Sequence, residues 1–144
     1  MATYPHVNAV AVRKTITFTG AANLGAVGAV PLFTITGKVI VLSISGLCTV
    51  NLTEAAPTAT LALGVTGSTS LFIAATTATG IDVDEFWVST TPTAAGIALP
   101  AACQNIVISA DIIGTVAAQA VNAGAIDMTV WYRPITTDGA LAAA

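Results

Sequence analysis

The chain has 144 residues and a formal net charge of −3, and only 8% of its residues are charged. A soluble domain of average composition carries about 25% charged residues. Hydrophobic residues make up 55% of the chain and the mean hydropathy is +0.86, although only 6% of the residues are aromatic. Four Lys and Arg residues exclude a protein that follows nucleic-acid phosphates. One His, two Cys and seven carboxylates are little material for catalysis, so the composition points away from an enzyme.

The length permits one domain, and the apolar residues alternate with Thr or Ser rather than running together. Residues 16–19 read Ile-Thr-Phe-Thr, and residues 33–36 read Phe-Thr-Ile-Thr. This alternation is the period of a β-strand and not that of a membrane helix. No basic segment followed by an apolar run opens the sequence, so we expect no signal peptide and a chain that folds in the cytoplasm where it is made.

The elements can be predicted in chain order from this alternation and from the turn residues between the apolar runs. Residues 7–19 alternate around Arg13 and Lys14, and charges in this position are typical of an arm or an edge strand. Residues 20–28 form a Gly- and Ala-rich loop. Further strands are expected at residues 30–36, 39–44, 58–65, 71–75, 106–113 and 125–133, and residues 47–53 either continue the strand at 39–44 or form the next one. The apolar stretch 97–103 contains a proline and is expected as a strand or a covered loop.

These eight to ten short strands are separated by turn signals and not by amphipathic helices. The pattern predicts an all-β fold, an antiparallel β-sandwich of Greek-key or jelly-roll type. We expect a flexible N-terminal arm at residues 1–14, the sandwich domain at residues 15–136 and a C-terminal tail at residues 137–144. The tail is small and weakly patterned, so it is expected to be mobile or used on a partner.

The residues that could carry chemistry are few. His6 is the single histidine and lies in the expected arm, where a catalytic triad has no support. Cys48 and Cys103 have apolar neighbours and no CxxC spacing, which leaves a pair across the sandwich or two buried free thiols. A reducing cytoplasm favours the free thiols.

Three of the seven carboxylates fall within four positions, at Asp82, Asp84 and Glu85. Such oxygens are the ligands that Ca²⁺ prefers, but the EF-hand pattern is absent. In a strand, Asp82 and Asp84 would share one face. The alternative is a solvated hairpin or a contact for a partner's Lys or Arg, and we expect no metal and no other cofactor here.

The aromatic residues Trp87, Trp131 and Tyr132 allow two interpretations. They could form a platform for a carbohydrate, or they could be core anchors and interface contacts. Because the chain has so few aromatic residues, core packing takes precedence and sugar binding is the weaker interpretation.

A sandwich of this size with so few charges must expose Thr, Ser, Asn, Gln, Gly and Ala. A nearly neutral surface is an association liability for a monomer, but it is normal where the surface is buried in an obligate assembly. The sequence therefore predicts a symmetric homo-oligomer that is docked on a larger assembly.

Three stretches, GAVGAVPLFTITG at residues 25–37, DEFWV at 84–88 and GAIDMTVWYRP at 124–134, resemble small structural proteins of tailed bacteriophages. The resemblance implies a head decoration (cement) protein, a β-rich trimer on capsomer junctions that binds the outer surface of the head and stabilises it. It implies the virion as location, itself and the major capsid protein as partners, and neither nucleic acid nor membrane. It implies no catalytic residues.

For such a protein the sites are surfaces, and the first contact candidates are Tyr4, His6, Arg13 and Lys14. The two cations would face an acidic surface of the capsid. Two alternatives stay open at this point. One is a head-spike, tail or fibre component that touches the host surface, and the other is a carbohydrate-binding β-sandwich module.

Overall fold

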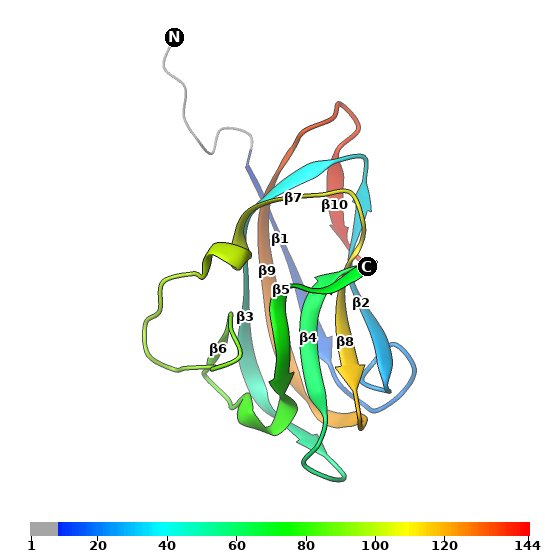
Figure 1. Ribbon diagram of the computed structural model, residues 1–144, viewed down its shortest axis with the longest axis vertical. Coiled ribbons are helices and arrows are strands. Elements are labelled where there is room, and N and C mark those ends of the chain that lie inside the picture. Colours follow the sequence, from blue (N-terminus) through cyan, green and yellow to red (C-terminus); the bar gives the residue numbers. More distant parts are fainter. Residues whose placement is uncertain (1–8) are drawn as a thin grey trace.

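The computed structural model describes residues 9–144, and these fold into two antiparallel sheets with no α-helix (Figure 1). No helix in this part of the chain is long and apolar enough to cross a membrane. Two short 3-10 turns, η1 (Ala78–Gly80) and η2 (Ala101–Cys103), interrupt the connections. The strands are β1 (Val10–Thr17), β2 (Gly28–Thr36), β3 (Val39–Glu54), β4 (Thr60–Val65), β5 (Ser68–Thr77), β6 (Phe86–Trp87), β7 (Gln104–Ile108), β8 (Ile112–Ala117), β9 (Val121–Pro134) and β10 (Ala140–Ala143).

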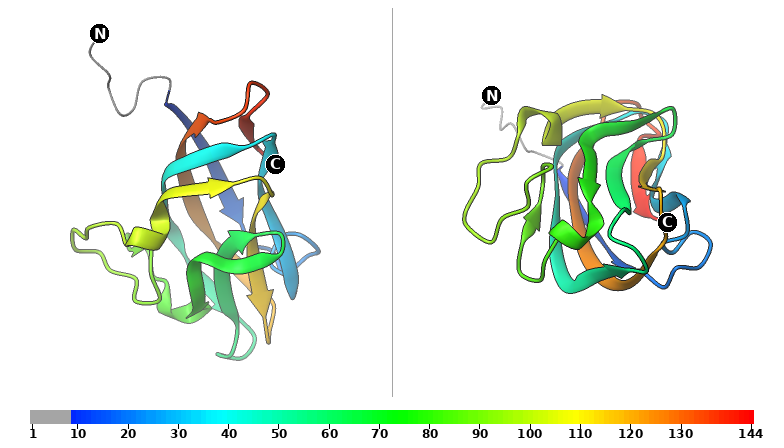
Figure 2. Two further views of the ribbon diagram at one scale, coloured as in Figure 1. Left: turned by 45° about the horizontal axis from the view of Figure 1, so that its top comes forward. Right: turned by 60° about the horizontal axis from the view of Figure 1, so that its bottom comes forward.

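The first sheet has the order β1-β9-β3-β6, with β7 also paired to β3, and the second sheet has the order β10-β2-β8-β4-β5. The chain doubles back on itself near its middle, at the hairpin of β4 and β5, and the earlier strands pair with later ones: β3 with β7, β2 with β8, and β1 with β9. A long antiparallel double strand folded over in this way is a jelly roll. The predicted antiparallel sandwich is therefore confirmed, and Figure 2 shows its two layers from two further sides.

The core lies between the sheets and is filled by the inward residues of both. Along β1, Ile16 is buried while its neighbours Thr15 and Thr17 are exposed, which is the alternation read from the sequence. Each fully buried aliphatic or aromatic side chain contributes about 1.5–3 kcal/mol relative to exposure. The largest fully buried side chains are Trp87, Phe33, Leu32, Ile44, Leu61, Leu63, Ile81, Ile112, Ile126 and Met128.

β3 is one continuous strand, so of the two alternatives for residues 47–53 the structure confirms that they continue the strand at 39–44. Its pairing with β9 shifts register at four places, and such bulges bend and twist a strand that would otherwise be too long for the sheet. Gly46 lies in the middle of the strand, where a Cβ atom would approach the Met128 sulfur at 3.0 Å and the Trp87 carbonyl oxygen at 3.2 Å. The glycine therefore lets Trp87 come close to β3.

The domain limit expected at residue 14 is wrong, because it falls inside a strand. Val10 to Lys14 pair with residues 128–132 of β9, so the edge-strand interpretation of this segment is the correct one. The earlier part of the expected arm, with Tyr4 and His6, lies outside the described residues.

The C-terminal tail is also more ordered than predicted, since Ala140–Ala143 form β10 on the edge of β2. Leu141 is the one large apolar residue of the tail, and it is only 4% exposed. It anchors a segment whose other residues are small, while the backbone completes the edge of the sheet. The Nζ of Lys14 donates a hydrogen bond to the carbonyl oxygen of Ala144, which ties β1 to the end of β10.

The docking of β10 predicts a stability effect. Leu141→Ala should lower the free energy of unfolding by about 2–4 kcal/mol, because it removes a buried side chain and leaves a cavity. Ala143→Ser, at an exposed position of the same strand, should change it by less than about 0.5 kcal/mol. Urea unfolding followed by circular dichroism measures both. Equal stability of the two variants would show that β10 does not pack on the core.

Candidate docking face

The two sheets differ in what they expose. Large hydrophobic side chains that are exposed on strands all belong to the first sheet, and none lies on a strand of the second sheet. They are Val10, Leu47, Val50, Phe86, Val107 and Trp131. The five strands of the second sheet also contain no charged residue. Val10 stands opposite Tyr132 and so lies on the inner side at the end of β1, whereas the other five hydrophobic residues lie on the outer side. The outer surface of the first sheet, called the docking face below, is therefore the candidate site.

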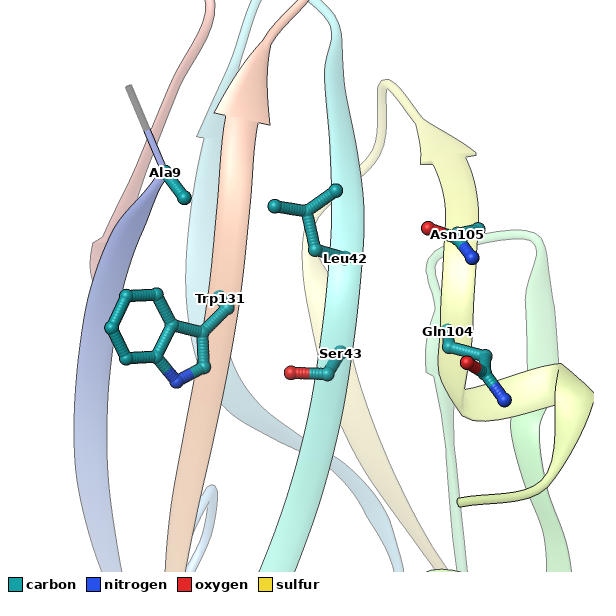
Figure 3. A pocket seen from close by; sticks show the side chains of 6 residues that line it. All are labelled: Ala9, Leu42, Ser43, Gln104, Asn105 and Trp131. Carbon is teal, nitrogen blue, oxygen red and sulfur yellow. The ribbon is translucent and has the colours of Figure 1, made fainter. Parts of the chain in front are cut away.

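A hollow of about 540 Å³ lies on this face around Trp131, which is 46% exposed (Figure 3). Across the sheet, Trp131 stands opposite Ala11 of β1 and Ser43 of β3. These small neighbours leave space on both sides of the indole. The hollow is lined by Ala9, Leu42, Ser43, Gln104, Asn105 and Trp131, so its lining is uncharged.

A β-bulge shapes the middle of this hollow. The β3–β9 register shifts between Val41 and Ser43, which leaves Leu42 without a direct partner on β9. Leu42 and Ser43 consequently both line the hollow, as Figure 3 shows, with Gln104 and Asn105 on β7 beyond them. No alternation in the sequence marks this bulge.

A second hollow of about 290 Å³ lies on the same face beside Phe86 of β6. The loop between β6 and η2, which stands out from the body of the sandwich, forms one of its walls (Figure 1). The lining consists of Ser45, Phe86, Val88, Gly96, Ile97 and Leu99. The apolar character of the docking face therefore extends from β9 to this loop.

The positive charges gather on the same sheet. Arg13 is exposed on β1 opposite Thr129, and its side chain has no partner among residues 9–144. Arg133 follows Trp131 by two positions on β9, so both side chains point to the outer face. Lys14 faces the other way and is bound to the Ala144 carbonyl. Of the two cations predicted as contacts, only Arg13 is available to a partner.

The acidic cluster forms a turn, so its residues do not share a strand face. The backbone N–H of Asp84 donates to the Cys48 carbonyl at 2.8 Å, and the N–H of Cys48 donates to the Glu85 carbonyl at 2.9 Å. A side-chain oxygen of Glu85 accepts the N–H of Asp82 at 2.9 Å. These bonds hold residues 81–85, called the acidic loop below, against the edge of β3.

The acidic loop does not assemble a metal site. Within residues 9–144, no three or more His, Cys, Asp or Glu side chains are grouped so that they could hold a metal ion. The exposed carboxylates of Asp82 and Asp84 accept no hydrogen bond in this part of the chain. The geometry thus leaves two free negative charges at the edge of the docking face.

Two of the three aromatic candidates are core residues, in agreement with the core-packing interpretation, and their burial does not fit their listing as interface contacts. Trp87 is completely buried, and its indole N–H donates to the Thr76 hydroxyl at 3.1 Å. Tyr132 is only 8% exposed. Trp131 and Tyr132 are adjacent in one strand and must therefore face opposite sides of the sheet, a signal that the sequence already contained.

The two cysteines are free and buried. The Cys48 sulfur lies 3.2 Å from the Val50 carbonyl oxygen, and the Cys103 sulfur lies 3.3 Å from that of Val88. Burial raises the pKa of the Cys48 thiol and raises that of Cys103 to about 11. Both thiols stay protonated at neutral pH, which suits core packing and neither metal binding nor nucleophilic chemistry.

Comparison with known proteins identifies a solved structure of similar fold. No family model and no curated protein sequence matches the chain. A solved structure described as the Cyanophage Pam1 capsid asymmetric unit contains a chain that is 20% identical, with a TM-score of 0.55. The match covers 93% of this chain and 93% of that chain. At this identity the likeness shows a shared fold.

The opposite placement of the two tryptophans can be checked by fluorescence. In Trp131→Phe, only the buried Trp87 remains, so its emission should lie at shorter wavelength and resist quenching by acrylamide. Trp87→Phe should keep the quenchable emission of Trp131 and lose about 1–3 kcal/mol of stability, because the smaller ring leaves space in the core and the Thr76 hydroxyl, which still donates to the Ala74 carbonyl, loses the indole N–H as a donor. Equal quenching in the two variants would contradict this geometry.

Burial of Cys103 predicts a pH dependence. The pKa of this thiol rises from 9.0 to about 11 on folding, so the unfolded chain releases the proton first as the pH increases. The stability is complete below about pH 9 and should decrease by about 2 kcal/mol by about pH 10.5. Urea unfolding of the wild type and of Cys103→Ala at both ends of this range isolates the effect. A wild-type slope no steeper than that of Cys103→Ala would disprove it.

Proposed function

We propose that the protein is a non-enzymatic structural component of a bacteriophage particle, a decoration protein that binds the outer surface of the head and stabilises it. The observation that carries this proposal is the likeness, over nearly the whole length of both chains, to a chain of a cyanophage capsid asymmetric unit. Jelly rolls occur in viral capsid domains and also in lectins, so the fold alone does not decide the function.

The docking face supports the same function. Interface cores are depleted in charge, and Trp and Arg are the residues that most often dominate the binding energy. This face combines the uncharged hollow around Trp131 with the exposed Arg13 beside it. A protein that works by covering a larger surface needs such a face and needs no catalytic group.

The finer points of the proposal follow the resemblance described above. The protein is made in the host cytoplasm, forms a homotrimer and binds the major capsid protein in the virion, with neither nucleic acid nor membrane as a partner. Arg13 faces an acidic surface of the capsid. Tyr4 and His6 are proposed contacts outside the described residues, whereas Lys14 acts indirectly because it holds Ala144.

Co-sedimentation with expanded empty heads tests the proposal. The purified protein should bind in saturable, stoichiometric fashion, and mass spectrometry should find it in purified particles. Arg13→Glu should weaken binding about tenfold or more, because it places like charges against each other. No binding to heads, together with absence from particles, would overturn the proposal.

A matched control separates this contact from a general effect of charge. Thr34→Glu combined with Thr36→Glu changes the net charge by the same amount as Arg13→Glu, at exposed positions of β2 in the second sheet. This variant should bind heads as the wild type does. Equal loss of binding in both variants would show that overall charge, and not the docking face, governs the interaction.

A second candidate is a sugar-binding role, either as a carbohydrate-binding module or as a head-spike, tail or fibre component that contacts the host. The specific observation in its favour is the half-exposed indole of Trp131 in a hollow that also presents the Gln104 and Asn105 amides. An aromatic face with amide groups around it can stack on a sugar ring and bind its hydroxyls. A glycan array without hits would remove this candidate.

A further inference from the structure

We infer that copies of this chain associate head to tail through the first sheet, with the acidic loop of one copy packed against Arg13 and Trp131 of the next. The inference rests on the proposed homo-oligomer and names the contact that would build it. It assigns Arg13 to the neighbouring copy in place of the capsid surface, so loss of head binding in Arg13→Glu would follow from loss of the oligomer. The partner is a second copy of this chain, and the argument depends on where the two complementary surfaces lie.

The two surfaces occupy opposite edges of one sheet. Arg13 belongs to β1, which is one edge of the first sheet, and β9 and β3 lie between it and β6. The acidic loop is held by backbone hydrogen bonds to Cys48, on the edge of β3 that faces away from β9, and it leads directly into β6. In Figure 1 this part of the chain lies on the side from which the β6–η2 loop protrudes.

This placement determines the type of contact. One copy cannot bring its own acidic loop onto its own β1, because the width of the sheet separates them. Two different surfaces that fit each other and lie on opposite sides of one molecule form a heterologous contact. Repetition of such a contact gives a closed ring, as in the proposed trimer, or an open filament.

The charges on the two edges are complementary and unpaired within residues 9–144. The Arg13 guanidinium has no partner there, and neither do the exposed carboxylates of Asp82 and Asp84. Asp127, the acidic residue on the outer face of β9, already accepts a hydrogen bond from the Thr15 hydroxyl at 2.7 Å. Arg13 is therefore available to pair with a carboxylate of another molecule.

Exposed ion pairs alone contribute little, so the contact also needs apolar area. Both surfaces supply it. In the acidic loop Val83 is 45% exposed, and the adjoining Phe86 is 37% exposed. On the other side Trp131 is 46% exposed in an uncharged hollow of about 540 Å³, which has room for an apolar side chain. An apolar centre with charges around it is the usual anatomy of an interface.

The test uses the purified chain without heads, so that only self-association is measured. By sedimentation velocity over a range of concentrations, the wild type should form one defined oligomer. Asp82→Lys and Arg13→Glu should each raise the dissociation constant at least about tenfold, because each places like charges in contact. The double variant should return to within about threefold of the wild type, since the pair is restored with exchanged signs.

Two further variants serve as controls, one for the second carboxylate of the acidic loop and one for added charge. Asp84 has a positive φ of 67°, so Asp84→Asn removes its charge with a residue that tolerates this conformation, and it should weaken association less than Asp82→Lys. Thr34→Lys on the second sheet is the control for added charge and should leave the oligomer unchanged. Circular dichroism confirms that every variant is folded.

The outcomes separate this inference from the proposed function. Each of three results would overturn the inference, whether or not the protein binds heads: a monomeric wild type, single variants that associate as the wild type does, or a double variant whose association does not recover. If the single variants dissociate and the double variant recovers but no form binds heads, the inference stands and the proposed function fails.

Discussion

The pairing of β9 with β3 is the interaction on which the rest of the structure depends. The ladder runs from Val39 opposite Pro134 to Glu54 opposite Val121, so it joins segments that are far apart in the sequence. β9 also pairs with β1, which makes it an inner strand of the first sheet. Non-local pairing of this kind closes long loops before it brings stabilising contacts, so a jelly roll is expected to fold slowly.

The same strand connects the core with the docking face. Met128, Val130 and Tyr132 point inward and are buried, and Trp131 and Arg133 consequently point outward. A slip of one residue in the pairing would exchange the two sets of side chains. The register that stabilises the core therefore also positions the exposed indole, and the candidate site has no separate scaffold of its own.

The sequence predicted the strands well wherever apolar residues alternate with Thr or Ser. The strand expected at residues 30–36 lies within β2, and the one expected at 125–133 lies within β9. It left open whether β3 continues through Gly46, because the role of this glycine depends on the close approach of Trp87 from a distant segment. It did not predict β10, since a short tail of small residues becomes a strand only when another strand offers its edge.

Alternation tells which residues share a face, but not which face another layer will cover. That is why the sequence treated Trp87, Trp131 and Tyr132 alike, whereas the sandwich buries two of them and exposes one. The structure also shows how the surface accommodates the low charge content of the chain. The second sheet exposes mainly Thr and Ala, whose short side chains offer water little apolar area, and the first sheet carries the large exposed apolar residues together with Arg13. Because of this unequal division, the charge-poor chain has one sheet with the features of an interface and one sheet without them.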